Sequence, residues 1–91
     1  MFDKERFHNA LALSLGYERI VKDKRITIQV DDSDDPWVTL KFQESPEVVH
    51  FKASGVADTS LLGRSTAMKD EINYISDAVH QAYIQASKSQ F

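Results

Sequence analysis

The sequence predicts an α+β domain in which an N-terminal and a C-terminal helix pack on one face of a three- or four-stranded antiparallel sheet, in the order α-β-β-β-α. Two observations support this prediction. Apolar residues recur at helical spacing near both ends of the chain, and they alternate with polar residues in three segments between those ends. Helices and half-buried strands each have one apolar face, so two packed layers bury all of these faces together.

The longest periodic segment is residues 65–87. Its apolar residues follow one another at spacings of 4, 3, 4, 3 and 4, in the order Met68, Ile72, Ile75, Val79, Ala82 and Ala86. Such spacing places them on one side of a helix, which at this length extends about 34 Å and crosses a small domain completely. We expect the first four of these residues to lie in the core.

A shorter helix is predicted to begin near Lys4. Asp3 is a favourable N-cap, and Phe2 can pack on Phe7 as a hydrophobic staple. Gly16 can end the helix in the left-handed conformation. Between these points, Phe7, Ala10, Leu11, Ser14 and Leu15 form one face at helical spacing.

Three strands are predicted at residues 25–30, 37–43 and 48–54, because apolar and polar residues alternate in each. Residues 17–24 are ambiguous and fit either a short strand or a connection. The second and third strands are joined by a short connection, which indicates that they run antiparallel. The strand residues expected in the core are Ile26, Ile28, Leu40, Phe42, Val49 and Phe51.

Length and composition limit the classes of protein that the chain can belong to. Its 91 residues, 42% of them hydrophobic and 27% charged, make one globular domain, residues 1–91. It has a net charge of −3 and no cysteine, and the absence of cysteine fits a reducing compartment. No apolar run approaches the ~20 residues that cross a bilayer, and the first residues do not have the pattern of a signal peptide. We therefore expect a cytoplasmic protein without a membrane partner.

No arrangement of residues predicts catalysis, a metal or a cofactor. The three histidines are not spaced as metal ligands, and there is no nucleophile elbow. Asp31, Ser33 and Asp35 have the alternate spacing of a calcium loop, but Pro36 and Phe42 replace the turn glycine and the bidentate glutamate. A hairpin loop explains this segment, and we expect the protein not to be an enzyme.

The remaining expectation is a protein-interaction module that binds another protein or forms a homodimer. The sheet face opposite the helices is predicted to be open, and we expect the contact residues to be Trp37, Lys41, His50 and Tyr74. An alternative interpretation of Trp37 is a local plug over the sheet edge. A variant of the main hypothesis is a phage-type or accessory inhibitor, whose acidic residues at 31–35, 44 and 47 imitate phosphates.

The alternative function is nucleic-acid binding. The element order, with GRSTAMKDE opening the last helix, resembles that of a double-stranded RNA-binding domain. The resemblance implies a basic cluster at the start of the second helix that binds phosphates. The matching region here offers Arg64 and Lys69, followed at once by Asp70 and Glu71. Nucleic acid is therefore not the partner that we expect.

Overall fold

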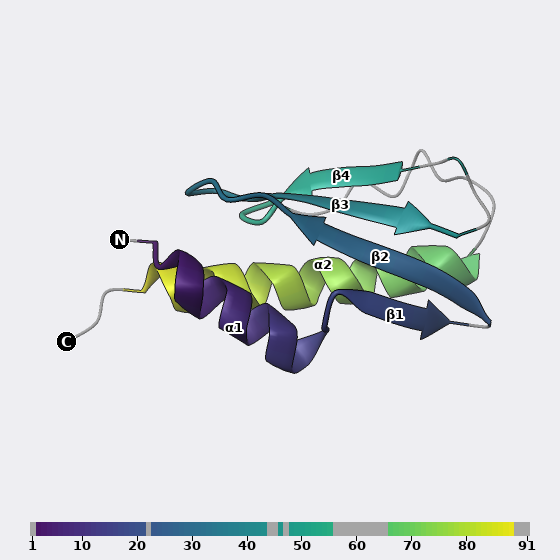
Figure 1. The fold of residues 1–91 in the computed structure, drawn as a ribbon, viewed down its shortest axis with the longest axis horizontal. Coiled ribbons are helices and arrows are strands. Elements are labelled where there is room, and N and C mark those ends of the chain that lie inside the picture. The colour runs from purple at the N-terminus through teal and green to yellow at the C-terminus, as the bar shows by residue number, and fades with distance from the viewer. Residues whose placement is uncertain (1, 22, 44–45, 47, 56–65, 89–91) are drawn as a thin grey trace.

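The computed structural model contains an N-terminal helix, four antiparallel strands and a C-terminal helix (Figure 1). It describes residues 2–21, 23–43, 46, 48–55 and 66–88, with only the backbone described for residues 66–68. The elements are α1 (Lys4–Ser14), β1 (Glu18–Val21), β2 (Lys24–Val30), β3 (Trp37–Phe42), β4 (Val48–Lys52) and α2 (Thr66–Ser87). The predicted α+β class is confirmed, with four strands in the order α-β-β-β-β-α.

The local features predicted for α1 are present at both of its ends. The Asp3 carboxylate caps the helix by accepting a hydrogen bond from the backbone N–H of Arg6 at 3.1 Å, and the rings of Phe2 and Phe7 lie 5.5 Å apart. Gly16 has a φ of +70°, and its N–H donates to the carbonyl of Leu11 at 3.0 Å. The N-cap and the glycine stop therefore set the length of this helix.

The four strands form a meander in which each pairs with its neighbour in the sequence, in the order β1-β2-β3-β4. The ambiguous residues 17–24 contain the edge strand β1, which pairs Val21 with Lys24 across a tight turn. Asp23 in this turn has a φ of 66°, the left-handed conformation that two-residue hairpin turns require. Aspartate adopts this conformation more readily than most residues, so position 23 does not require a glycine.

One apolar core joins both helices to the inner face of the sheet, which is the face toward α2. It includes the residues predicted for β2, β3 and β4, except that Phe42 is only partly buried at its margin. The Met68 side chain lies outside the described residues. The buried hydrophobic residues are Phe7, Leu11, Leu15, Ile26, Ile28, Val38, Leu40, Val49, Phe51, Ala53, Ile72, Ile75, Val79, Ala82 and Ala86.

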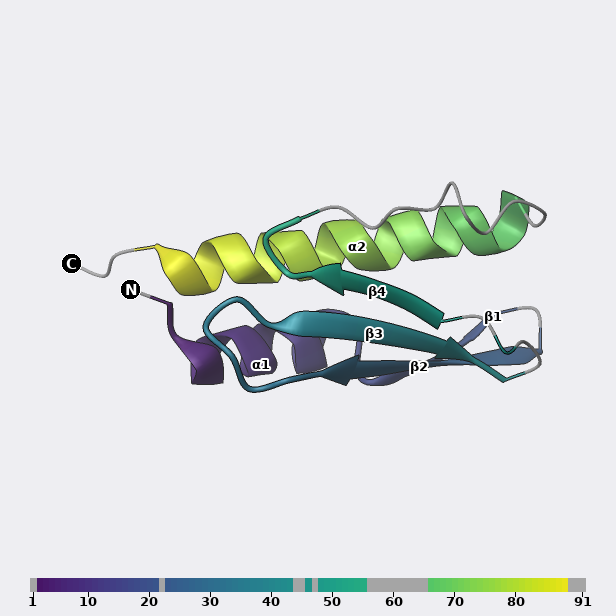
Figure 2. The ribbon, with the colours of Figure 1, turned by 90° about the horizontal axis from the view of Figure 1, so that it is seen from above.

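The two helices run alongside each other in opposite directions (Figures 1 and 2). The N–H of Asp3 donates to the carbonyl of Ala86 at 2.9 Å, so the start of α1 is joined to the last turn of α2. Helix α2 lies along the inner face of the sheet, and its C-terminal part extends beside α1, which lies in line with β1. Within the described residues, neither helix is both long and apolar enough to cross a membrane.

Candidate interaction surface

The face of the sheet that points away from α2, here called the outer face, is covered by no described element (Figure 2). Strand alternation and register place eleven side chains on it: Glu18, Ile20, Arg25, Thr27, Gln29, Trp37, Thr39, Lys41, Val48, His50 and Lys52. Three of them are basic and one is acidic, although the whole chain has a net charge of −3. The outer face is therefore a basic surface on an acidic protein.

Trp37 is the largest side chain on the outer face and is 39% exposed. Its indole stacks on the imidazole of His50, with 4.3 Å between ring centroids and 4° between the planes. Nζ of Lys52 lies 5.4 Å from the centroid of the Trp37 ring, a cation–π distance. Because His50 and Lys52 are alternate residues of β4, the pairing of β3 with β4 fixes this cluster.

The His50 ring also forms a hydrogen bond with a side chain of the neighbouring strand. Its Nδ1 lies 3.0 Å from Oγ1 of Thr39, the residue directly opposite it on β3. Ring stacking and this hydrogen bond restrict the rotamers of both aromatic side chains before any partner arrives. A preordered aromatic pair loses less side-chain entropy on binding than a mobile one does.

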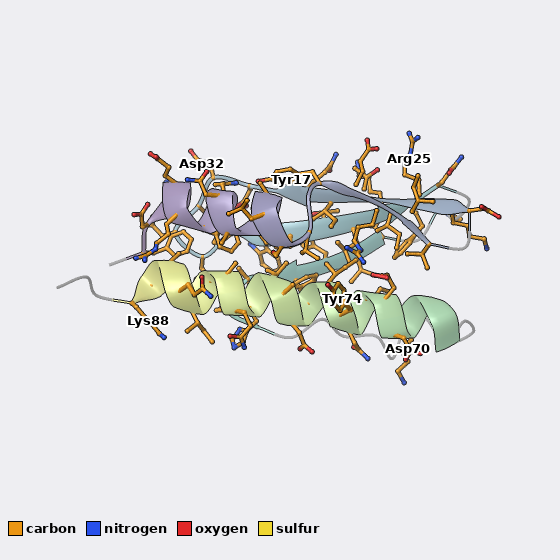
Figure 3. The ribbon with its side chains drawn as sticks, turned by 90° about the horizontal axis from the view of Figure 1, so that it is seen from below. Tyr17, Arg25, Asp32, Asp70, Tyr74 and Lys88 are labelled. Atoms are coloured by element: carbon orange, nitrogen blue, oxygen red, sulfur yellow. The ribbon has the colours of Figure 1, made fainter. Side chains whose placement is uncertain are left out.

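Three of the four predicted contact residues share the outer face, namely Trp37, Lys41 and His50. Tyr74 does not lie with them, because it projects from α2 on the other side of the sheet (Figure 3). It is exposed, and its ring lies 4.9 Å from the guanidinium carbon of Arg19. The four residues therefore do not form one continuous surface.

Arg19, which contacts the Tyr74 ring, also forms an ion pair that was not predicted from the sequence. Arg19 lies on the inner side of β1, where its Nε donates to Oε2 of Glu71 on α2 at 2.9 Å. Both side chains are largely buried, at 26% and 12% exposed respectively. The pair joins the edge strand to the long helix, and its position explains why β1 is held to the domain despite having only four residues.

The loop between β2 and β3 is closed by two of its aspartates. Oδ1 of Asp31 accepts hydrogen bonds from the hydroxyl and the N–H of Ser33 at 2.7 and 3.1 Å, and from the N–H of Trp37 at 3.1 Å. The Asp35 carboxylate accepts from the N–H and hydroxyl of Ser54 at 3.2 and 2.8 Å. Among the residues that the structure describes, no group of three or more His, Asp or Glu side chains could hold a metal ion.

The other two aspartates of this loop project into solvent. The side chains of Asp32 and Asp34 are 88% and 90% exposed, and Nζ of Lys4 lies 3.8 and 3.9 Å from them. Ion pairs this exposed contribute little to stability. Asp31 and Asp35 therefore build the loop, whereas Asp32 and Asp34 are available to a partner.

Replacing Asp31 should change how stability depends on pH. The pKa of Asp31 lies below its ordinary value of 3.8, chiefly because the Ser33 hydroxyl donates to the charged form, with further backbone donors at Ser33 and Trp37. A pKa that is lower in the folded state stabilises folding fully above the unfolded value, and this stabilisation is lost as the pH falls through the folded value. Urea unfolding should therefore show that Asp31→Asn destabilises the protein at pH 7 and by less at pH 2.5.

The same pair of measurements on Asp34→Asn is the control, because Asp34 accepts none of the loop hydrogen bonds described above. We expect that variant to differ little from the wild type at either pH. An Asp31→Asn difference of the same size at both pH values would contradict the assigned role of its charge.

The two remaining histidines lie away from the outer face. His8 is on α1, with its Nδ1 3.2 Å from the hydroxyl of Tyr17. His80 is on α2, where its Nδ1 is buried without a hydrogen-bond partner among the described residues. His80 follows Asp77 by three positions, a spacing that favours a contact between side chains on a helix, but Nδ1 of His80 does not make this contact.

Comparison with other proteins adds no family to these observations. The chain matches no protein-family model, and neither the curated proteins nor the solved structures give a significant match.

Proposed function

We propose that this chain is a small, non-catalytic protein-interaction module whose contact surface is the outer face. The observation that supports the proposal best is Trp37, a large aromatic residue that is 39% exposed at the edge of a basic, uncovered sheet face. Tryptophan is enriched at the energetically important positions of interfaces. The partner in this proposal is another protein or a second copy of the chain.

The surroundings of Trp37 fit a contact surface. His50 stacks on its ring, and Lys41 and Lys52 supply positive charge on the same face. Aromatic residues with charged residues around them form the usual combination of an anchor and a polar rim. Tyr74 was predicted as a fourth contact residue, and we propose that any contact it makes is a separate one.

Nucleic-acid binding is less well supported by the same observations. At the start of α2, Lys69 is exposed and is followed by the exposed Asp70, while Glu71 is paired with Arg19. Arg64 lies outside the described residues. Two acidic residues beside a lysine weaken a phosphate site, since affinity for nucleic acid comes largely from unopposed basic side chains.

Trp37→Ala should abolish the capture of a partner while leaving the protein folded. Tagged wild type and variant are incubated with a lysate of the source organism, with and without nuclease and at two salt concentrations. We expect the wild type to capture a discrete protein and the variant to capture at least about tenfold less of it, which is the size of effect that truncation of a hot-spot residue has. The melting temperature should fall by about 4–8 °C while unfolding stays cooperative, because the lost ring stacking contributes about 1 kcal/mol.

Leu13→Ala is the matched control, because Leu13 is an exposed apolar residue on α1 and lies away from the outer face. It should capture the partner as the wild type does. Unfolding of the Trp37→Ala protein would instead support the interpretation of Trp37 as a plug. Captured material that disappears with nuclease would support the nucleic-acid alternative.

A further inference from the structure

The outer face, taken with the loop beside it, carries more negative charge at one end and more positive charge at the other. The loop that precedes β3 presents the exposed carboxylates of Asp32 and Asp34 at one end. Arg25 and Lys41 lie at the other end, near the start of β2 and the end of β3. Figure 3 shows that Asp32 and Arg25 project from the same side of the molecule, away from α2 and far apart along its long axis.

Exposed apolar residues follow the same division. Trp37 lies at the loop end of β3, opposite Lys52, whereas Val48 lies at the far end of β4, opposite Lys41. Both are exposed. The loop end thus combines Trp37 with Asp32, Asp34 and Lys52. The far end combines Val48 with Lys41 and with Arg25, whose Nε lies 3.7 Å from Oε1 of Glu18. The loop end is therefore the more acidic of the two.

We propose that the outer face docks on the outer face of a second copy of this chain, through a twofold axis that lies in the interface and runs across the strands. This inference rests on the proposed function and names its partner. Such an axis stacks β3 on β3 and β4 on β4 with their ends reversed. Asp32 and Asp34 of each copy then lie over the end of the other copy that carries Arg25. Each Trp37 lies over Lys41 of the other copy, and each Val48 lies over its Lys52.

A twofold axis that runs along the strands instead would bring groups of like charge together. It keeps the ends aligned and places the acidic loop of one copy over the acidic loop of the other, which costs energy. With the axis across the strands, each favourable contact occurs twice, as in any isologous interface. The charge pattern therefore selects one of the two face-to-face arrangements.

The size of the outer face determines how strong this dimer can be. Four strands about 4.8 Å apart and five or six residues long have a footprint of roughly 300 Å². The two faces together then bury on the order of 600 Å², which is below the size of a stable specific interface and typical of a weak contact. Lys4 competes for Asp32 and Asp34 within each copy. We therefore expect a weak dimer that salt dissociates further.

A charge-swap experiment tests this arrangement. One double variant, Asp32→Lys with Asp34→Lys, makes the loop basic, and a second, Arg25→Glu with Lys41→Glu, makes the far end acidic. Sedimentation velocity at 50 mM salt should show a wild-type monomer–dimer equilibrium and a dissociation constant at least about tenfold weaker for either variant alone. An equimolar mixture of the two variants should dimerise again, because both of its loop contacts then join opposite charges.

Asp70→Lys with Asp77→Lys is the matched control, because it makes the same change of charge at two exposed positions of α2. It should dimerise like the wild type. Since Trp37 is the single tryptophan of the chain, its emission should shift to shorter wavelength as the wild type associates. Circular dichroism establishes that each variant is folded.

Three results would overturn the inference. The wild-type protein could stay monomeric at a protein concentration of 1 mM in 50 mM salt, the mixture of the two variants could stay monomeric, or the control variant could be as impaired as the loop variant. The proposed function fails separately. If no dimer forms but Trp37→Ala still prevents capture of a different protein, the outer face binds that protein and only the self-docking is wrong.

Discussion

Ile75→Ala is expected to lower the free energy of unfolding by about 2–5 kcal/mol, the cost of truncating a fully buried isoleucine. Ile75 has no exposed surface and lies on the side of α2 that packs on the inner face of the sheet. Domains of this size have a total stability near the lower end of about 5–15 kcal/mol, so one such cavity removes a large share of it. Urea denaturation followed by circular dichroism measures the change.

Ile20→Ala is the matched control, because it deletes the same atoms from a side chain that is 70% exposed on the outer face. We expect a change within about 0.5 kcal/mol, as for most surface substitutions. If the two variants were equally stable, the packing of α2 on the sheet would be wrong.

Glu71→Ala should destabilise the protein by about 1–3 kcal/mol, since it leaves a largely buried guanidinium without its carboxylate. Arg19 would keep its contact with the Tyr74 ring, but a cation–π contact compensates only in part. The pair is partly exposed, which places the expected cost below that of a fully buried ion pair. Urea denaturation again gives the change in free energy.

Asp70→Ala, one residue earlier in α2, removes an exposed carboxylate and should change stability little. A double-mutant cycle with Arg19→Ala separates the pair from its surroundings, because the double variant should be less destabilised than the sum of the single ones. Additive effects would show that Arg19 and Glu71 do not interact in solution.

Most of the fold could be predicted from sequence because its determinants are local. The cap at Asp3, the stop at Gly16 and the period of residues 65–87 each depend on residues within a few turns of helix. Alternation in β2, β3 and β4 likewise identified which side chains enter the core. The same alternation, applied to neighbouring strands, placed Trp37, Lys41 and His50 on one face.

The features that could not be predicted depend on contacts between distant residues. Apolar and polar residues alternate only weakly in β1, because its inner residue Arg19 is charged. The carboxylate that pairs with Arg19 belongs to Glu71, which lies 52 positions away in the sequence. A charged residue on an inner strand face hides the periodicity on which strand prediction relies. The separation of Tyr74 from the other expected contact residues could not be predicted for a related reason, since helical spacing does not reveal which flank of α2 adjoins which edge of the sheet.

The hydrogen bond between Asp3 and Ala86 has a consequence for the order in which this protein folds during synthesis. The meander needs only neighbouring segments, so its hairpins can form while the chain is still being made. Helix α1 emerges before the four strands and α2, yet its apolar residues Phe7 and Leu11 are covered only when α2 is complete. The nascent chain therefore carries an uncovered apolar helix until α2 has been synthesised, and this interval is when α1 is most exposed to aggregation and to chaperones.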